Sequence, residues 1–231
     1  MNEYQFNSNG MPAPVLSISQ VMRQVYVKMF LALVVSAISA YICVTVEPIR
    51  NFIFSSRLVF YGLCIVELIL VVCVSASVTT CKNAARSSFL FYLYAIINGL
   101  TLSAILLIYT TSSIVLTFLI TAGVFAAMSV YGYFTTRDLS RMGSFLFMAL
   151  IGLIICSVVN LFAHSSTLEW IISFAGVAIF VGLTAWDTQK IKAMLAAYPE
   201  RSEQISTFGA LSLYLDFINM FIYLLRFFGR D

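Results

Sequence analysis

The chain has 231 residues, of which 61% are hydrophobic and only 10% are charged, and its mean hydropathy is +0.97. Soluble domains carry about 25% charged residues to keep their surface in water, so this composition excludes a soluble domain, a disordered chain and a nucleic-acid-binding module. The formal net charge of +3 is too small to indicate a polyanionic partner. The sequence therefore predicts a membrane protein whose main surroundings are lipid.

The chain begins with a mixed, polar stretch, residues 1–24, which contains Pro12 and Pro14. This stretch lacks the basic start and the apolar core of a cleavable signal peptide. We therefore expect it to form a polar cytoplasmic tail. Residues 25–231 are expected to form a single seven-helix transmembrane domain.

Seven apolar segments follow the tail, and each is close to the ~20 residues with which a helix crosses ~30 Å of hydrocarbon. In lipid every backbone amide needs an internal partner, and a helix provides these partners within one segment. The expected fold class is therefore an all-α membrane protein with seven transmembrane helices. The segments are residues 25–46, 58–78, 89–109, 114–135, 144–162, 168–186 and 208–228.

The distribution of lysine and arginine predicts the orientation, because cytoplasmic loops carry an excess of both. With the N-terminus in the cytoplasm, nine of the thirteen basic residues fall on the cytoplasmic side. The last segment is the exception, because Arg226 and Arg230 then lie outside. A re-entrant last helix, with both chain ends in the cytoplasm, stays open as an alternative. The nine residues are Arg23, Lys28, Lys82, Arg86, Arg137, Arg141, Lys190, Lys192 and Arg201.

Most charges lie in loops, but three carboxylates do not fit that pattern. Glu67 is near the middle of the second segment, Asp187 ends the sixth, and Asp216 lies within the seventh. A charge at the centre of a membrane helix costs about 2.5–3.5 kcal/mol on insertion scales, so such residues face a cavity, pair with another group or have a function. For Glu67 and Asp216 the structural alternative is a hydrogen-bond clamp between helices.

Polar and small residues form one stripe along the last segment. They recur at steps of three and four residues, which places them on a single helix face. The residues between them are mainly Leu, Ile, Phe and Met, so the stripe must face protein or water. We therefore expect the last helix at the centre of the bundle, with Asp187 and Asp216 as neighbours in its cytoplasmic half. The stripe consists of Gly209, Ser212, Asp216, Asn219, Tyr223 and Arg226.

Two carboxylates in contact at low dielectric do not both ionise cheaply, and they share a proton. Such a pair has three uses: an aspartyl protease dyad, a proton-operated latch, or a site for a hard cation. For Ca²⁺, Asp187, Asp216, Asn219 and backbone carbonyls offer oxygen ligands. The chain has no GxGD motif and no P-loop, and its single histidine, His164, excludes a His-rich zinc site. We expect neither an enzyme activity nor a resident cofactor.

The C-terminal run of residues 210–229, which includes Asp216, Asn219 and Arg226, closely resembles the signature of the Bax inhibitor family, the transmembrane Bax inhibitor motif proteins. Supporting matches are residues 184–191 around Asp187, residues 138–143, and the acid Glu67 in the second helix. The resemblance covers nearly the whole chain beyond its first twenty residues. The compact length is similar to that of the bacterial branch.

The resemblance implies a seven-helix fold whose last helix is surrounded by the other six. It also implies a pH-sensitive calcium leak gated by a di-aspartyl pair, which maps onto Asp187 and Asp216. The family's acid on the permeation path maps onto Glu67. Better-studied relatives also have an arginine that locks the pair, at the cytoplasmic end of the second helix. This chain has no arginine at the matching place, and Lys82 or Arg86 nearby are the candidates for that role.

The leading hypothesis is a channel that passes Ca²⁺ down its gradient, in a bacterial inner membrane, with its N-terminus in the cytoplasm. Two alternatives stay open. One is a non-conducting regulator that binds a membrane-bound ATP-dependent protease or a stress or cell-death partner. The other is a proton-coupled carrier. The sequence indicates no nucleic-acid partner and does not fix the oligomeric state, and it is compatible with a monomer.

Overall fold

The computed structural model describes residues 17–80 and 84–229, and this part of the chain is almost entirely helical. Seven of its helices are long and apolar enough to cross a membrane, which confirms the predicted fold class. A short helix, α2 (Glu47–Phe54), and a 3₁₀ turn at Pro199–Arg201 connect some of them. The spanning helices are α1 (Ile18–Thr45), α3 (Arg57–Thr80), α4 (Ala84–Ile108), α5 (Thr111–Phe134), α6 (Ser140–Ala163), α7 (Ser166–Ala197) and α8 (Ser202–Phe228).

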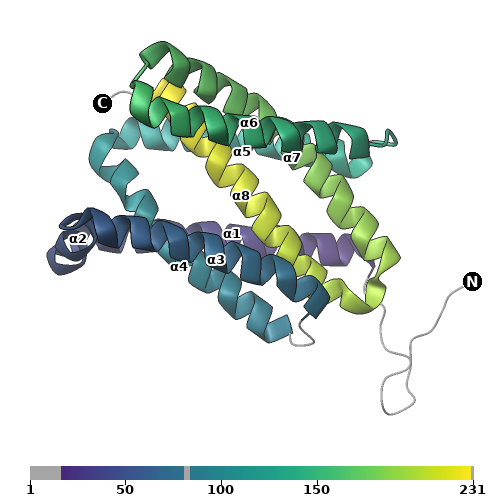
Figure 1. Ribbon diagram of the computed structural model, residues 1–231. Coiled ribbons are helices and arrows are strands. Elements are labelled where there is room, and N and C mark those ends of the chain that lie inside the picture. The colour runs from purple at the N-terminus through teal and green to yellow at the C-terminus, as the bar shows by residue number, and fades with distance from the viewer. Residues whose placement is uncertain (1–16, 81–83, 230–231) are drawn as a thin grey trace, which may run out of the picture.

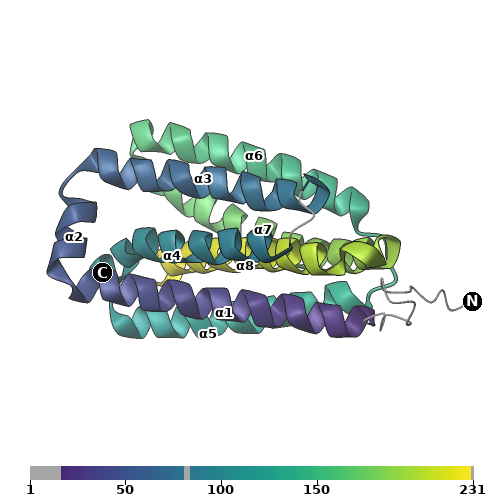
Figure 2. The ribbon, with the colours of Figure 1, turned by 90° about the horizontal axis from the view of Figure 1, so that it is seen from below.

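The last helix, α8, lies at the centre of the bundle, as predicted. Helices α1, α3 and α4 form one group and α5, α6 and α7 form the other, and α8 runs diagonally between them (Figure 1). It packs against α7, α1, α5, α3 and α4, while α6 reaches it through an apolar cluster that includes Met220 and Leu224. The start of α1 and the end of α8 lie at opposite ends of the bundle (Figure 2). Helix α8 therefore crosses the bundle fully and does not re-enter.

Glycines allow the helices within each group to approach closely. A Cβ atom at Gly99 of α4 would collide with the backbone carbonyl of Ser36 in α1. A Cβ atom at Gly132 of α5 would likewise collide with the backbone carbonyl of Ala185 in α7. Small residues at such crossings let membrane helices pack backbone against backbone. These two contacts fix the position of α4 on α1 and of α5 on α7.

The helices are longer than the apolar segments from which they were predicted. Helix α1 begins at Ile18, because Ser17 and Gln20 form a capping box in which each side chain accepts a hydrogen bond from the other residue's backbone N–H. Residues 18–24, assigned above to the polar tail, are therefore helical. Helix α7 continues to Ala197, so Asp187 lies inside a helix and not at its end. Helix α2, with Pro48 in its first turn, was not predicted.

Candidate functional site

The polar stripe of α8 faces α7. Near the start of α8, Gly209 lies against the side chain of Ile191 in α7. About one and a half turns from its end, the ring of Tyr223 lies against Gly176 of α7. Residue numbers thus rise along α8 while they fall along α7, so the two helices are antiparallel and in register along the stripe.

Asp187 and Asp216 fall between those two contacts, one on each helix. Their carboxylates interact electrostatically across the α7–α8 interface. Both side chains are buried, with Asp187 9% exposed and Asp216 4% exposed. Atom Oδ2 of Asp216 is fully buried and has no hydrogen-bond partner. Both predicted acids are therefore buried, their charges influence each other, and one carboxylate oxygen of Asp216 has no hydrogen-bond partner.

Lys190 is the cation beside this pair. Its ammonium group interacts electrostatically with both Asp187 and Asp216. It lies 4.6 Å from the centroid of the Trp186 ring and 5.4 Å from that of Phe208, distances at which aromatic rings attract a cation. Sequence reasoning treated Lys190 as a loop charge. The signal that identifies it is its spacing of three residues from Asp187, which places both side chains on one helix face.

Glu67 of α3 belongs to a hydrogen-bond network that joins four helices. Its carboxylate accepts a hydrogen bond from the Thr101 hydroxyl at 2.7 Å and one from the Asn98 amide at 3.3 Å, both on α4. The Tyr214 hydroxyl of α8 donates to Oδ1 of Asn98 at 2.8 Å and lies 2.7 Å from the Ser36 hydroxyl of α1. Glu67 therefore has the clamp geometry given above as its structural alternative, and this clamp also connects it to the central helix.

Helix α8 presents these two polar features on different faces. Asp216 faces α7, whereas Tyr214, two residues earlier, faces α1 and α4. The Tyr214 side chain is 0% exposed, and its ring packs edge-on against Phe91 and Tyr94. The acid pair and the Glu67 network are thus separated by the width of one helix.

Comparison with known proteins places the chain in a family. The sequence model of the family described as "Inhibitor of apoptosis-promoting Bax1" matches residues 18–231. The chain belongs to the Bax inhibitor family. It is 43% identical over 227 residues to the inner membrane protein YbhL of Escherichia coli strain K12, covering 96% of this chain and 97% of YbhL. It is also 45% identical over 212 residues to an uncharacterized protein of Rickettsia prowazekii, covering 90% and 89% of the two chains. A protein of Borreliella burgdorferi is 43% identical over 219 residues, or 94% of each chain.

The sequence offered Lys82 and Arg86 as candidates for a cation that locks the aspartate pair. Lys82 lies outside the described residues. Arg86 is exposed in the first turn of α4 and is not among the charges that interact with either aspartate. Among the residues that the structure describes, the cation that interacts with both aspartates of this Bax inhibitor chain is Lys190, on the same helix as Asp187.

Hydrogen bonds also define the positions of Asn219 and Lys28 in this Bax inhibitor chain. The amide of Asn219 donates to the carbonyl of Leu215 in its own helix, which leaves its side-chain oxygen as the group available to a ligand. Lys28 lies inside α1, half-buried, and its ammonium donates to the hydroxyls of Ser206 and Thr207 at 2.7 and 2.9 Å. It therefore anchors α1 to the start of α8. The described residues contain no cluster of three or more His, Cys, Asp or Glu side chains that could hold a metal ion.

Proposed function

We propose that this Bax inhibitor family protein is a pH-sensitive calcium leak channel, which passes Ca²⁺ down its gradient. The observation that carries the proposal is the burial of two acids that influence each other electrostatically, Asp187 and Asp216, with Oδ2 of Asp216 left without a hydrogen-bond partner. A buried acceptor without a partner is costly. A proton or a hard cation removes that cost, because both bind to carboxylate oxygens.

In this proposal the pair is the gate. At low pH one proton is shared by the carboxyl groups of Asp187 and Asp216 and holds α7 against α8, so the path is closed. At higher pH this proton leaves, the two negative charges repel each other, and the contact loosens. The anionic pair then attracts Ca²⁺, the permeant ion. No covalent step and no resident cofactor is needed.

Lys190 and Glu67 have supporting roles in the proposed channel. Lys190 interacts with both aspartates, and we assign it the role of the cation beside the pair, for which Lys82 and Arg86 were candidates. Its positive charge favours the ionised pair, so it sets the pH at which the shared proton leaves. Glu67 attracts the cation midway across the bundle, on the opposite side of α8. By analogy with the inner membrane protein YbhL we propose that the protein lies in a bacterial inner membrane. The distribution of lysine and arginine supports a cytoplasmic N-terminus.

The test is calcium efflux from liposomes loaded with Ca²⁺, measured across a pH series. Efflux through the wild-type protein should rise with pH, and Asp216→Asn should flatten that dependence. Lys190→Gln should move the onset of efflux to a higher pH than in the wild type, because without a nearby positive charge the shared proton is harder to remove. The matched control is Asp138→Asn, which removes a fully exposed acid from the loop before α6 and should leave the profile unchanged.

Two results would contradict the proposal in different ways. An Asp216→Asn profile identical to that of the wild type removes the latch. A wild-type protein that passes no Ca²⁺ at any pH removes the channel, and favours a non-conducting regulator of a membrane protease or another membrane partner. Uptake that saturates and needs a proton gradient favours a proton-coupled carrier.

A further inference from the structure

A groove of about 680 Å³ lies between α1 and α5. These two helices belong to different groups in the bundle and have little direct contact with each other. The groove is lined by side chains of both, and several of these, including Phe30 and Val130, are exposed towards the surroundings of the bundle. The groove is therefore open sideways, in the direction where the lipid lies.

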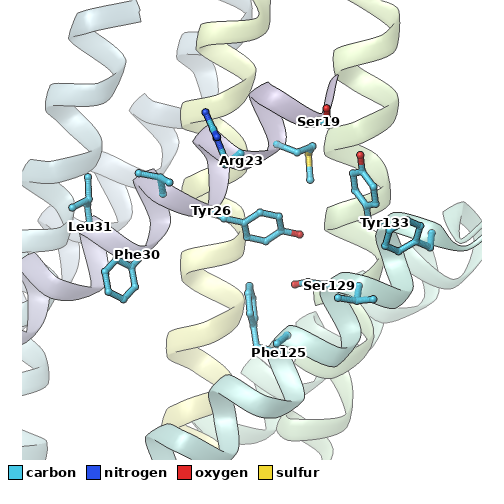
Figure 3. Close-up of a pocket in the computed structure, with 13 residues that line it drawn as sticks. Ser19, Arg23, Tyr26, Phe30, Leu31, Phe125, Ser129 and Tyr133 are labelled. Carbon is cyan, nitrogen blue, oxygen red and sulfur yellow. The ribbon is translucent and has the colours of Figure 1, made fainter. Parts of the chain in front are cut away.

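One end of this α1–α5 groove is polar and the rest is apolar. Figure 3 shows Ser19 and Arg23 at one end, Phe30 and Phe125 at the other, and the hydroxyl of Tyr26 between them. The polar end is near the start of α1, where a membrane-spanning helix meets the headgroup region. Tyrosines are enriched at that level of a bilayer, and long arginine side chains reach towards it.

Arg23 carries a positive charge at this polar end without a protein partner. The side chain is exposed, and among the described residues it makes neither an ion pair nor a hydrogen bond. The described part of α1 contains no acidic residue. A phosphate group is the complement of such a guanidinium, because its oxygens accept two parallel hydrogen bonds.

A second polar group lies deeper in the groove. Ser129 of α5 is 5% exposed, and its hydroxyl is buried without a hydrogen-bond partner. It lies beside the hydroxyl of Tyr26 in Figure 3, between the Arg23 end and the apolar end. The ester carbonyls of a glycerophospholipid lie between phosphate and acyl chain, and they accept hydrogen bonds from hydroxyls.

The groove is long and has the volume of a small-molecule pocket. From Ser19 to Leu31 it follows α1 for about 18 Å, at 1.5 Å per residue. Its 680 Å³ lies within the ~300–1,000 Å³ of pockets that bind small molecules. Its length and volume therefore suit an extended apolar chain.

We propose that the α1–α5 groove binds one anionic glycerophospholipid, taken from the leaflet in which α1 begins. The phosphate lies on Arg23, the ester carbonyls lie beside Tyr26 and Ser129, and one acyl chain lies between Phe30 and Phe125. The lipid fills the gap between the two helix groups on this side of α8. This site is independent of the calcium pathway proposed above.

The test is a count of lipids retained by the purified full-length protein. The protein is taken from bilayers with equal amounts of phosphatidylglycerol and phosphatidylethanolamine and studied by native mass spectrometry. We expect one phosphatidylglycerol per chain, in preference to phosphatidylethanolamine. One basic residue near an anionic lipid contributes ~1 kcal/mol, which is about fivefold in affinity. Arg23→Gln should therefore lower the preference about fivefold, and Arg141→Gln, an exposed control at the start of α6, should not.

A second variant tests the groove itself. Ala126→Trp adds bulk at an exposed position that lines the groove, so it should reduce the retention of both lipids while the protein stays folded. Three results would overturn the site: equal retention of the two lipids by the wild type, an unchanged preference in Arg23→Gln, or full retention in Ala126→Trp. If a second copy or residues 1–16 of the chain occupied the groove in place of a lipid, Ala126→Trp would still retain the lipids in full.

Discussion

Replacing Tyr214 by phenylalanine tests the network that connects Glu67 to the central helix. The change removes one hydroxyl and keeps the ring, so the edge-on contacts with Phe91 and Tyr94, at centroid distances of 6.0 and 5.8 Å, remain. The lost hydroxyl donates to Asn98 at 2.8 Å and lies 2.7 Å from the hydroxyl of Ser36. The substitution therefore isolates the hydrogen bonds from the packing.

The expected loss of stability depends on which group loses its hydrogen-bond partner. Oδ1 of Asn98 loses its donor at a site where the residue is 8% exposed. Ser36 keeps the carbonyl of Ala95, 2.7 Å away, as an acceptor. An unsatisfied buried acceptor costs about 1–3 kcal/mol in soluble proteins, whereas hydrogen bonds between membrane helices average about 0.6 kcal/mol and reach about 1.7. We expect Tyr214→Phe to lower the free energy of unfolding by about 1 kcal/mol.

The assay is reversible unfolding in lipid bicelles, with a double-mutant cycle between Tyr214 and Asn98. Tyr214→Phe should cost less in an Asn98→Ala background, because the hydrogen bond is already absent there. The control is Tyr94→Phe, which removes the hydroxyl of a neighbouring tyrosine that makes none of the hydrogen bonds described for this network. Unchanged stability in Tyr214→Phe, or the same loss in both backgrounds, would refute the assignment of the hydrogen bond as the connection.

Two further predictions concern the packing of α5 and the loop before α6. Gly132→Ala should destabilise the protein by about 1–3 kcal/mol, the usual cost of overpacking, because its new Cβ meets the backbone of Ala185, which cannot move aside. Gly123→Ala on the same helix has open space around it and should be neutral or slightly stabilising in the same unfolding assay. The hydroxyl and then the backbone N–H of Ser140 lower the pKa of Asp138 by hydrogen bonding to its carboxylate. The ionised Asp138 carboxylate therefore stabilises the folded protein at pH values above the pKa that it has in the unfolded chain. This stabilisation is lost as the pH falls through the lower pKa of the folded state. Ser140→Ala should raise that pKa in an NMR titration of the Asp138 carboxyl, and an unchanged value would show that the Ser140 hydroxyl is not the main cause.

The fold was predictable from the sequence where lipid determines it. Apolar runs of about 20 residues mark the spanning helices, and the stripe from Gly209 to Arg226 marks the helix that faces protein. The helix ends were less predictable, since hydropathy reports the lipid-facing part and not the polar turns beyond it. Ser17 therefore starts α1 seven residues before the apolar run at residue 25. Helix α2, with 8 residues, is too short to give a spanning signal.

Only some residues of the candidate site could be singled out from the sequence, and the reason is physical. Buried acids on two helices are conspicuous in an apolar sequence, which is why Asp187 and Asp216 were found. The partners of Glu67 were not, because Asn98 and Tyr214 are ordinary residues whose meeting depends on how the helices pack. The close approach of α4 to α1 at Gly99 sets that packing, and no spacing within one helix reveals it.

The position of α8 makes the acid pair and the Glu67 network parts of one mechanical unit. Helix α8 packs against α7 through the face that carries Asp216, and against α1 and α4 through the face that carries Tyr214. Hydrogen bonds between two oxygens, 2.7–2.8 Å long here, leave the favourable range beyond about 3.0 Å. A displacement of α8 by a few tenths of an ångström away from Asn98 is therefore enough to weaken the bond that Tyr214 donates to it. A change in charge that shifts α8 against α1 and α4 therefore also changes the hydrogen bonding around Glu67, although Asp216 and Tyr214 lie on opposite sides of the helix.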